Sequence, residues 1–332
     1  MKPSKITTTA ILFLFNSIVS LHAQSFPKKV VLIHNEPDSL RRFTFDIGGD
    51  FQGGMATGAS GIEATVFFRN YKKLAFQLGG TYYFNSIKYP ADFLQSHDTK
   101  AYYQVEAIFS LLPWRKEKIK SSTVITSAYN PAGVSTENID TKRVTRYGFR
   151  FGYSLSRLPI KADNAPRLGL KYIRNEQGNI VEYTGTYATT GTSSLITFGL
   201  QRRKQLRYRC NIYKPPGKLH SIDNVAKIRD MYFDLTYLTA VSYLDMSQIT
   251  HSGQKHAYSI HPADNPIRPL GWRAGMQFLN ESISYLGFKF GVEVGCRYGI
   301  NASSFTMFDT SAYYSKVTLG LTFLNDPIKI RR

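Results

Sequence analysis

Apolar and polar residues alternate with a period of two along much of this chain. Successive side chains of a β-strand point to opposite faces, so such a stretch predicts a strand with one apolar and one polar face. The stretch 285–300 shows the pattern although it carries three charges. One set of alternate positions is apolar and the other is glycine-rich and charged: Leu286, Phe288, Phe290, Val292, Val294, Cys296 and Tyr298 against Gly287, Lys289, Gly291, Glu293, Gly295 and Arg297.

Ten stretches of roughly ten residues share this alternation. Their aromatic residues cluster near the strand ends, their polar sets are rich in glycine and mixed in charge, and short turns alternate with long polar loops. A soluble β-sandwich also alternates, but these three features favour an all-β fold, a transmembrane antiparallel up-and-down β-barrel. The barrel must close, because an open edge in lipid leaves backbone groups unpaired. The ten predicted strands are 43–51, 61–69, 74–84, 102–112, 146–154, 194–202, 230–241, 269–279, 285–300 and 312–323.

Two further features concern the number and length of the strands. Residues 167–173 and 180–188 flank a polar turn and could cross the membrane as one more hairpin, so twelve strands remain an alternative to ten. Residues 118–127 can pair with 139–148, and 202–213 can pair with the residues before 230. These pairs predict extended hairpins on the periplasmic side of the barrel.

The first 23 residues have the pattern of a secretory signal peptide. Lys2 and Lys5 give a positive start, an apolar run follows from residue 10 to residue 19, and Ala23 suits the position before a cleavage site. The predicted organisation is therefore a signal peptide (1–23), a periplasmic N-terminal segment (24–42), an outer-membrane barrel (43–324) and a periplasmic tail (325–332). The predicted location is the outer membrane of a Gram-negative cell, in contact with lipid and lipopolysaccharide.

The charged residues of the alternating strands fall on the polar set, which faces the interior of a membrane barrel. A ten-stranded lumen is small, and long side chains can fill it. We therefore expect a salt-bridged interior with little open channel; a path for charged solutes is the alternative. The predicted lumen charge network comprises Asp46, Glu63, Glu106, Arg146, Arg150, Asp234, Arg273, Lys289, Glu293, Arg297 and Lys316.

The formal net charge of the chain is +19, which becomes +17 once Lys2 and Lys5 are removed with the signal peptide. The segments assigned to the periplasmic side hold 26 bases and 9 acids, so they carry this whole excess. A dense basic surface attracts acidic partners. We expect docking to an acidic periplasmic protein or lipoprotein; the compartment excludes nucleic acid. The predicted docking residues are Lys116, Lys118, Lys120, Arg202, Arg203, Lys204, Arg207 and Arg209.

Several motifs resemble those of outer-membrane β-barrel proteins of the Bacteroidota. They are the signal ending "HAQS", the strands with "GF" and "GY" pairs, and the closing "YYSKVTLGLTFLN". The resemblance covers nearly all of the mature chain and implies a barrel fold and an outer-membrane location. It implies no catalytic residues. Many barrels of this kind end on an aromatic residue, whereas here Phe323 is followed by nine more residues.

Catalytic and metal-binding patterns are sparse. His97 and Asp98 lie on a predicted extracellular loop with Asp50 at the end of a strand, which is the weak basis for an omptin-like hydrolase. His251, His256 and His261 share another loop, but intervals of five place them on no common helix face. The sequence predicts no metal and no cofactor. It favours a non-enzymatic docking or structural subunit of an envelope complex, with a small-solute channel and then a surface hydrolase as alternatives.

Overall fold

A computed structural model gives the fold of this chain. It describes residues 29–37, 43–54, 58–70, 73–86, 102–127, 135–160, 172–182, 189–214, 217–243, 246–249, 255–264, 267–281, 286–296, 299–300 and 313–324. Within this part of the chain, no helix is long and apolar enough to cross a membrane. The predicted signal peptide, its cleavage site and the predicted C-terminal tail lie outside the described residues.

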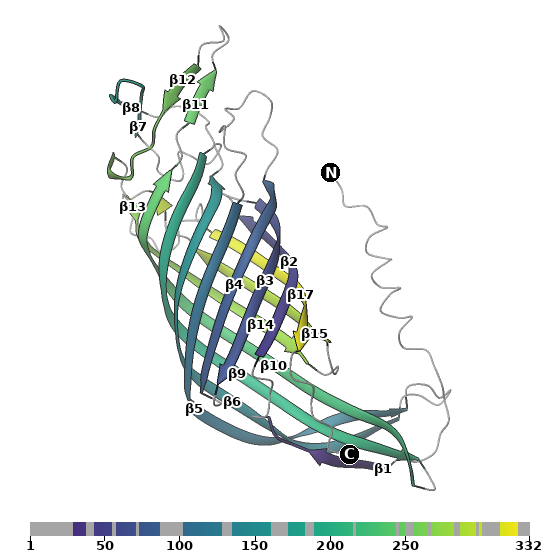
Figure 1. The fold of residues 1–332 in the computed structure, drawn as a ribbon. Coiled ribbons are helices and arrows are strands. Elements are labelled where there is room, and N and C mark those ends of the chain that lie inside the picture. Colours follow the sequence, from purple (N-terminus) through teal and green to yellow (C-terminus); the bar gives the residue numbers. More distant parts are fainter. Residues whose placement is uncertain are drawn as a thin grey trace. The chain divides into compact units, whose positions relative to one another are not determined.

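Ten antiparallel strands form a closed barrel (Figure 1). Strand β17 pairs with β2, and β6 pairs with β9, so the sheet has no open edge around the ring. The structure therefore confirms the predicted ten-stranded barrel. Its strands are β2 (Phe43–Gly54), β3 (Gly58–Asn70), β4 (Leu74–Ser86), β5 (Tyr102–Ser127), β6 (Ser135–Ile160), β9 (Thr189–Lys214), β10 (Lys218–Tyr243), β14 (Leu270–Asn280), β15 (Leu286–Cys296) and β17 (Tyr313–Leu324).

The two faces of the barrel wall differ as the alternation predicts. The outward positions expose large apolar side chains, and the inward positions bury polar and charged ones. An apolar exterior of this kind is stable against lipid and not against water, so the fold indicates an outer-membrane protein. The exposed residues include Ile47, Phe51, Ile62, Phe68, Phe76, Leu78, Val105, Phe109, Phe151, Ile196, Phe198, Leu200, Phe233, Leu235, Phe288, Leu319 and Leu321.

The twelve-strand alternative is wrong. Strands β7 (Tyr172–Arg174) and β8 (Ile180–Glu182) pair with each other in a separate two-stranded sheet outside the barrel ring. Each has three residues, whereas a tilted strand needs about 9–11 to cross a bilayer. Short elements also occur in the other long connections: β11 (Met246–Ile249), β12 (Lys255–Tyr258), a 3₁₀ helix (Pro262–Asp264), β13 (Ile267–Arg268) and β16 (Gly299–Ile300).

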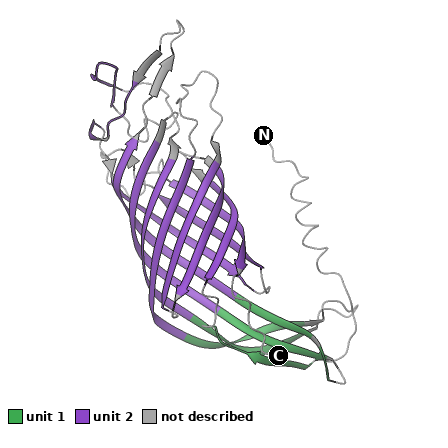
Figure 2. Cartoon of the chain, in the orientation of Figure 1, with its two compact units in different colours: residues 1–39, 117–144, 206–226 green, residues 40–116, 145–205, 227–332 purple. Residues whose placement is uncertain are grey.

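The chain divides into two compact units (Figure 2). The barrel unit comprises residues 40–116, 145–205 and 227–332. The smaller unit, called the extension below, comprises residues 1–39, 117–144 and 206–226. Strands β5, β6, β9 and β10 have 26 residues each and contribute to both units. The structure thus confirms the predicted lengthening of these two hairpins.

The extension contains one strand that the alternation did not predict, β1 (Lys29–His34). It runs antiparallel to β9, with Lys29 opposite Tyr213 and Leu32 opposite Cys210. Its end reaches β6, where the Asn35 side-chain amide donates to the Asp140 carbonyl and its oxygen accepts from the Lys142 backbone N–H. Strand β1 therefore bridges β9 and β6 within the extension.

The extension has an apolar core of its own. Val124, Tyr208, Cys210 and Ile212 are buried, and residues of β1, β6, β9 and β10 pack against them: Val30, Leu32, Ile139, Leu206 and Val225. Along β9 the buried set of alternate residues changes at this point. Gln201, Arg203, Gln205 and Arg207 are buried first, and Tyr208, Cys210 and Ile212 are buried next.

Candidate functional site

Glu63 holds two lysines in the lumen of the barrel. Its carboxylate lies 2.7 Å from Lys289 Nζ and 3.1 Å from Lys316 Nζ. Lys289 also pairs with Asp46 at 3.4 Å, and Lys316 pairs with Asp50 at 2.7 Å. The five residues come from β2, β3, β15 and β17, which are neighbours in the sheet, so their polar faces converge on one wall.

Arg273 of β14 is the centre of a second cluster. It pairs with Glu106 at 2.5 Å and with Asp234 at 2.9 Å, and lies 3.9 Å from Glu293. Arg150 of β6 reaches Asp234 at 3.6 Å. Because the carboxylates of three strands surround one guanidinium, this cluster ties opposite parts of the barrel wall together.

Tyr232 lies inside this second cluster. Its hydroxyl donates to Glu293 at 2.5 Å, and its ring lies under the Arg150 guanidinium, 3.8 Å from the ring centroid. Tyr314 donates to the other Glu293 oxygen at 2.8 Å. An arginine stacked on an aromatic ring is stabilised by the ring's negative face as well as by its ion pairs.

A glycine makes room for the Asp234 carboxylate. A Cβ on Gly199 of β9 would collide with Asp234 Oδ1 and with the Phe233 carbonyl. Asp234 is fully buried, and it needs this space to reach Arg150 and Arg273 together. The glycines of the inward set therefore shape the lumen as much as the charges do.

Two further ion pairs extend the lumen network beyond the residues predicted from sequence. Arg203 of β9 forms a bidentate pair with Asp230, with both N–O distances at 2.8 Å. Arg69 of β3 pairs with Glu281 at 2.9 Å, and the Glu281 side chain is buried. Period-two alternation places Arg203 and Asp230 on inward faces, so continuing the pattern past residue 201 could have found this pair.

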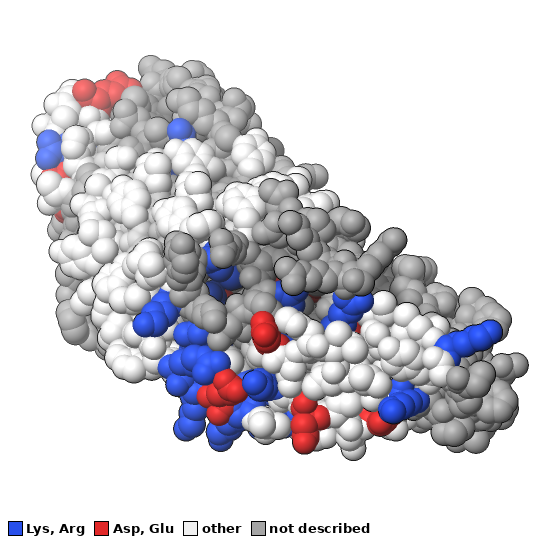
Figure 3. All heavy atoms as spheres, turned by 60° about the horizontal axis from the view of Figure 1, so that its bottom comes forward, with Lys and Arg blue, Asp and Glu red and all other residues white. Residues whose placement is uncertain are grey.

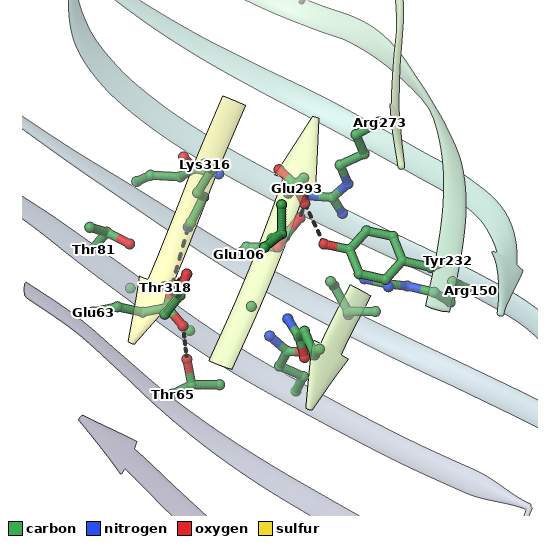
Figure 4. Close-up of a pocket in the computed structure, with 18 residues that line it drawn as sticks. Glu63, Thr65, Thr81, Glu106, Arg150, Tyr232, Arg273, Glu293, Lys316 and Thr318 are labelled. Carbon is green, nitrogen blue, oxygen red and sulfur yellow. Dashed lines mark hydrogen bonds and ion pairs between the residues drawn. The ribbon is translucent and has the colours of Figure 1, made fainter. Parts of the chain in front are cut away.

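The ion pairs leave little free space. A cavity of about 50 Å³ lies between the two clusters, lined by Glu63, Glu106, Arg150, Tyr232, Glu293 and Lys316 among others (Figure 4). Such a volume holds about four water molecules. The described side chains thus fill the centre of the lumen and give it a nearly balanced charge.

The predicted lumen residues have clear positions. Nine of them take part in the ion pairs above: Asp46, Glu63, Glu106, Arg150, Asp234, Arg273, Lys289, Glu293 and Lys316. Arg146 is buried on the inward face of β6. Arg297 lies outside the described residues.

The predicted docking residues separate into three groups. Lys116, Lys118 and Lys120 are exposed on β5. Lys204 is exposed, and Arg202 is half-buried with its guanidinium 5.8 Å from the centre of the Tyr147 ring. Figure 3 shows lysine and arginine side chains gathered on the face that it brings forward, with fewer acidic ones among them.

Two of the docking predictions are wrong. Arg203 and Arg207 are buried, because alternate residues of β9 face inward and these two belong to the inward set. Their charged groups are buried and are therefore not accessible to a partner. Arg209 is half-buried in the extension.

The residues weighed for catalysis or metal binding give no assembled centre in the part of the chain that the structure describes. His97, Asp98 and His251 fall outside it, and His261 is exposed. Asp50 is buried and engaged, since it pairs with Lys316 and accepts from Thr81 at 3.0 Å. Among described residues, no three His, Cys, Asp or Glu side chains are grouped to hold a metal ion.

The long loops are tied together by an ion pair. Arg174 donates two hydrogen bonds to Asp264, at 2.7 and 2.8 Å, and pairs through its backbone with Ser259. These hydrogen bonds lower the pKa of the Asp264 carboxyl. These contacts therefore join the β7–β8 hairpin to the segment that holds Ser259 and Asp264.

Comparisons with known proteins add little to the fold. No protein-family model matches the chain, and no curated protein matches it. Among solved structures, it is similar to the TodX monoaromatic hydrocarbon channel deltaS2 mutant at 9% identity and a TM-score of 0.25, with 86% of this chain and 90% of that chain covered. The CymD monoaromatic hydrocarbon channel matches at 8% identity and a TM-score of 0.24, with the same coverage. Outer-membrane expressed OmpT of Vibrio cholerae matches at 9% identity and a TM-score of 0.17, over 91% of this chain and 99% of that chain. At these TM-scores the likeness carries no argument about what this chain does.

Proposed function

We propose that this protein is a non-enzymatic outer-membrane barrel that docks a partner of the cell envelope through its extension. The observation that carries the proposal is the extension itself. Four strands have 26 residues each, whereas about 9–11 suffice to cross the membrane. A barrel that only had to span the bilayer would end these strands at short turns, as β3 and β4 do.

The connections between strands favour a periplasmic extension. The two hairpins that form the extension turn within residues 128–134 and 215–217, and β3 and β4 are joined by residues 71–73. The connections at the opposite strand ends are longer, such as residues 87–101 and 161–188. Known barrels have short periplasmic turns and long extracellular loops, so the partner would be periplasmic or a lipoprotein.

The basic residues of β9 and β5 lie in different surroundings, and we assign them different roles. Arg202 and Lys204 continue the outward set of β9 directly after Ile196, Phe198 and Leu200. Bases that follow a lipid-facing stretch suit the phosphates of lipid headgroups. Lys116, Lys118 and Lys120 of β5 follow Trp114, an exposed residue whose ring contacts Phe149. Lys118 and Lys120 lie in the extension, and we assign them to a protein partner.

The experiment is a salt-dependent pull-down of the protein from the outer membrane of its source cell. A triple variant with glutamine at Lys116, Lys118 and Lys120 should lose its partner at low salt, because the attraction is electrostatic and screened by salt. A double variant with glutamine at Lys218 and Lys227, two exposed bases of β10, is the control. An unchanged set of co-purifying proteins in the triple variant would count against docking.

A small-solute channel is the second candidate, favoured by the polar cavity of about 50 Å³ in the lumen. Buried ion pairs lie on both sides of it. Planar-bilayer recordings separate the two candidates. A docking barrel should show no steady conductance, whereas a channel should conduct and change its ion selectivity when Glu63 or Lys316 is replaced.

A further inference from the structure

One edge of β5 in the extension has no partner strand among the described residues. Strand β4 pairs with β5 only as far as Leu74 opposite Leu111, followed by the hydrogen bond from Leu112 N–H to the Lys73 carbonyl. Strand β5 then continues to Ser127. A strand edge without a neighbour presents a row of free N–H and C=O groups that can pair with another chain.

The other edge of β5 is occupied by β6. Ser122 Oγ and Thr141 Oγ1 are hydrogen-bonded at 2.5 Å, and Thr123 donates to the Asn138 side chain at 2.9 Å. Strands β5 and β6 are neighbours in the sheet order. Among the described residues the extension therefore ends at β5 on this side, and β6 holds the edge in an extended conformation.

The side chains along this edge alternate in chemistry. Lys118 and Lys120 belong to one set of alternate positions, and both are exposed. Ile119 and Ile125 belong to the other set and are 66% and 61% exposed, although isoleucine is usually buried. The same strand thus offers positive charge on one face and aliphatic surface on the other.

We infer that the β5 edge from Lys118 to Ile125 binds an extended acidic segment of the partner as an added β-strand. In this mode the backbone ladder supplies affinity and the alternate side chains supply specificity. Acidic residues of the added strand would lie opposite Lys118 and Lys120, and aliphatic residues opposite Ile119 and Ile125. The inference rests on the proposed docking function and names the segment that docks.

The second edge of the extension serves as an internal comparison. Strand β10 pairs with β14 only from Lys227 opposite Asn280, so along residues 218–226 the edge of β10 that faces away from β9 has no neighbouring strand in the described part of the chain. That edge carries Lys218 and Asp223, without the alternating lysines of β5. An acidic strand should therefore choose β5, and charge complementarity decides between the two edges.

Lysines on an edge can also serve to keep other strands away. Protection and docking predict opposite results when an acidic strand is offered. A protected edge should not bind it, whereas a docking edge should. A partner with carboxylates at alternate positions turns the same lysines into cross-strand pairs.

The test uses a blocked ten-residue peptide in which glutamate alternates with valine and threonine. Its binding to the full-length protein in detergent is followed by fluorescence anisotropy at low and high salt. A second peptide of the same sequence carries N-methyl groups on alternate backbone nitrogens, which removes ladder donors and leaves the charge. A third has lysine in place of glutamate.

We expect the first peptide to bind, the N-methylated peptide to bind at least tenfold more weakly, and the lysine peptide not to bind. The double variant with Lys118→Gln and Lys120→Gln should weaken binding of the first peptide about fivefold at low salt. The control double variant with Lys218→Gln and Lys227→Gln should bind as the unchanged protein does.

The outcomes separate the inference from the docking proposal. If the acidic and N-methylated peptides bind equally, strand addition is wrong, while a basic docking surface stands. If neither binds and the triple lysine variant keeps its partners in the pull-down, both proposals fail. If neither peptide binds but the triple variant loses its partner, the docking proposal stands and the added strand is rejected.

Discussion

Along β9, Ile196, Phe198 and Leu200 are exposed in the barrel, whereas Tyr208, Cys210 and Ile212 of the same alternating set are buried in the extension. The sequence pattern does not change between the two regions; the surroundings do. In the barrel the apolar set can face lipid, and the charged set must be buried with partners. In the extension the apolar set is covered by β1 and by neighbouring strands. A period of two therefore defines two faces but not which of them is inside.

The largest expected loss of stability follows from a substitution in the barrel interior. Glu63→Leu removes the carboxylate that holds Lys289 and Lys316 and leaves both cations buried with fewer partners. Breaking a buried ion pair in this way costs about 3–5 kcal/mol in unfolding free energy. Urea unfolding in detergent measures this loss of unfolding free energy. The control is Ala64→Leu, on the outward face of the same strand, which should change stability by less than about 0.5 kcal/mol. Equal losses would contradict the assignment of the two faces.

The next largest effect is in the extension. Ile212→Ala should destabilise its apolar core by about 2–4 kcal/mol, because it leaves a cavity among packed residues. Hydrogen exchange should rise in β1 and the end of β9, while the barrel strands keep their protection. Ile125→Ala is the control, since that side chain is mostly exposed. Loss of protection throughout the barrel would show that the two regions do not unfold separately.

The extension should also be sensitive to alkaline pH. Burial, with the nearby Asp223 carboxylate, raises the pKa of the Cys210 thiol from 9.0 to about 11. The neutral thiol is the form that the folded state favours, so its contribution is fully present below pH 9 and is lost as the pH rises towards 11. Thiol alkylation at pH 8 should be slow and should accelerate steeply above pH 10. Fast alkylation at pH 8 would mean that the core opens easily.

The smallest effect is expected at the bases next to the lipid-facing stretch. Replacing Arg202 and Lys204 by glutamine should lower thermal stability in anionic lipid vesicles slightly, by less than about 2 kcal/mol, since each base near such a surface contributes about 1 kcal/mol. In neutral vesicles the change should vanish. A loss of equal size in both kinds of vesicle would assign these bases to packing instead of headgroup contact.

The sequence predicts the barrel better than it predicts the sites. Alternation identifies the ten strands and their two faces, because one face of each strand is mainly apolar across the barrel wall. It does not identify β1, whose four consecutive apolar residues, Val30 to Ile33, show no alternation. It also does not show that Tyr232 meets Glu293, since that contact depends on the register of three strands that are distant in sequence. The burial of Arg203 and Arg207 was predictable from the inward set of β9, but charge density favoured the opposite interpretation.

The pairing of β1 with β9 has a consequence for the order of assembly. Leu32 lies opposite Cys210, which is 178 residues further along the chain (210 minus 32). Contacts between such distant residues form slowly, because a long loop must close before any of them is gained. β1 can therefore pair only once β9 is present, and until then the apolar face of β9 lacks its contacts with Val30 and Leu32. A periplasmic chaperone that binds exposed strands would therefore have to protect β9 until β1 pairs with it.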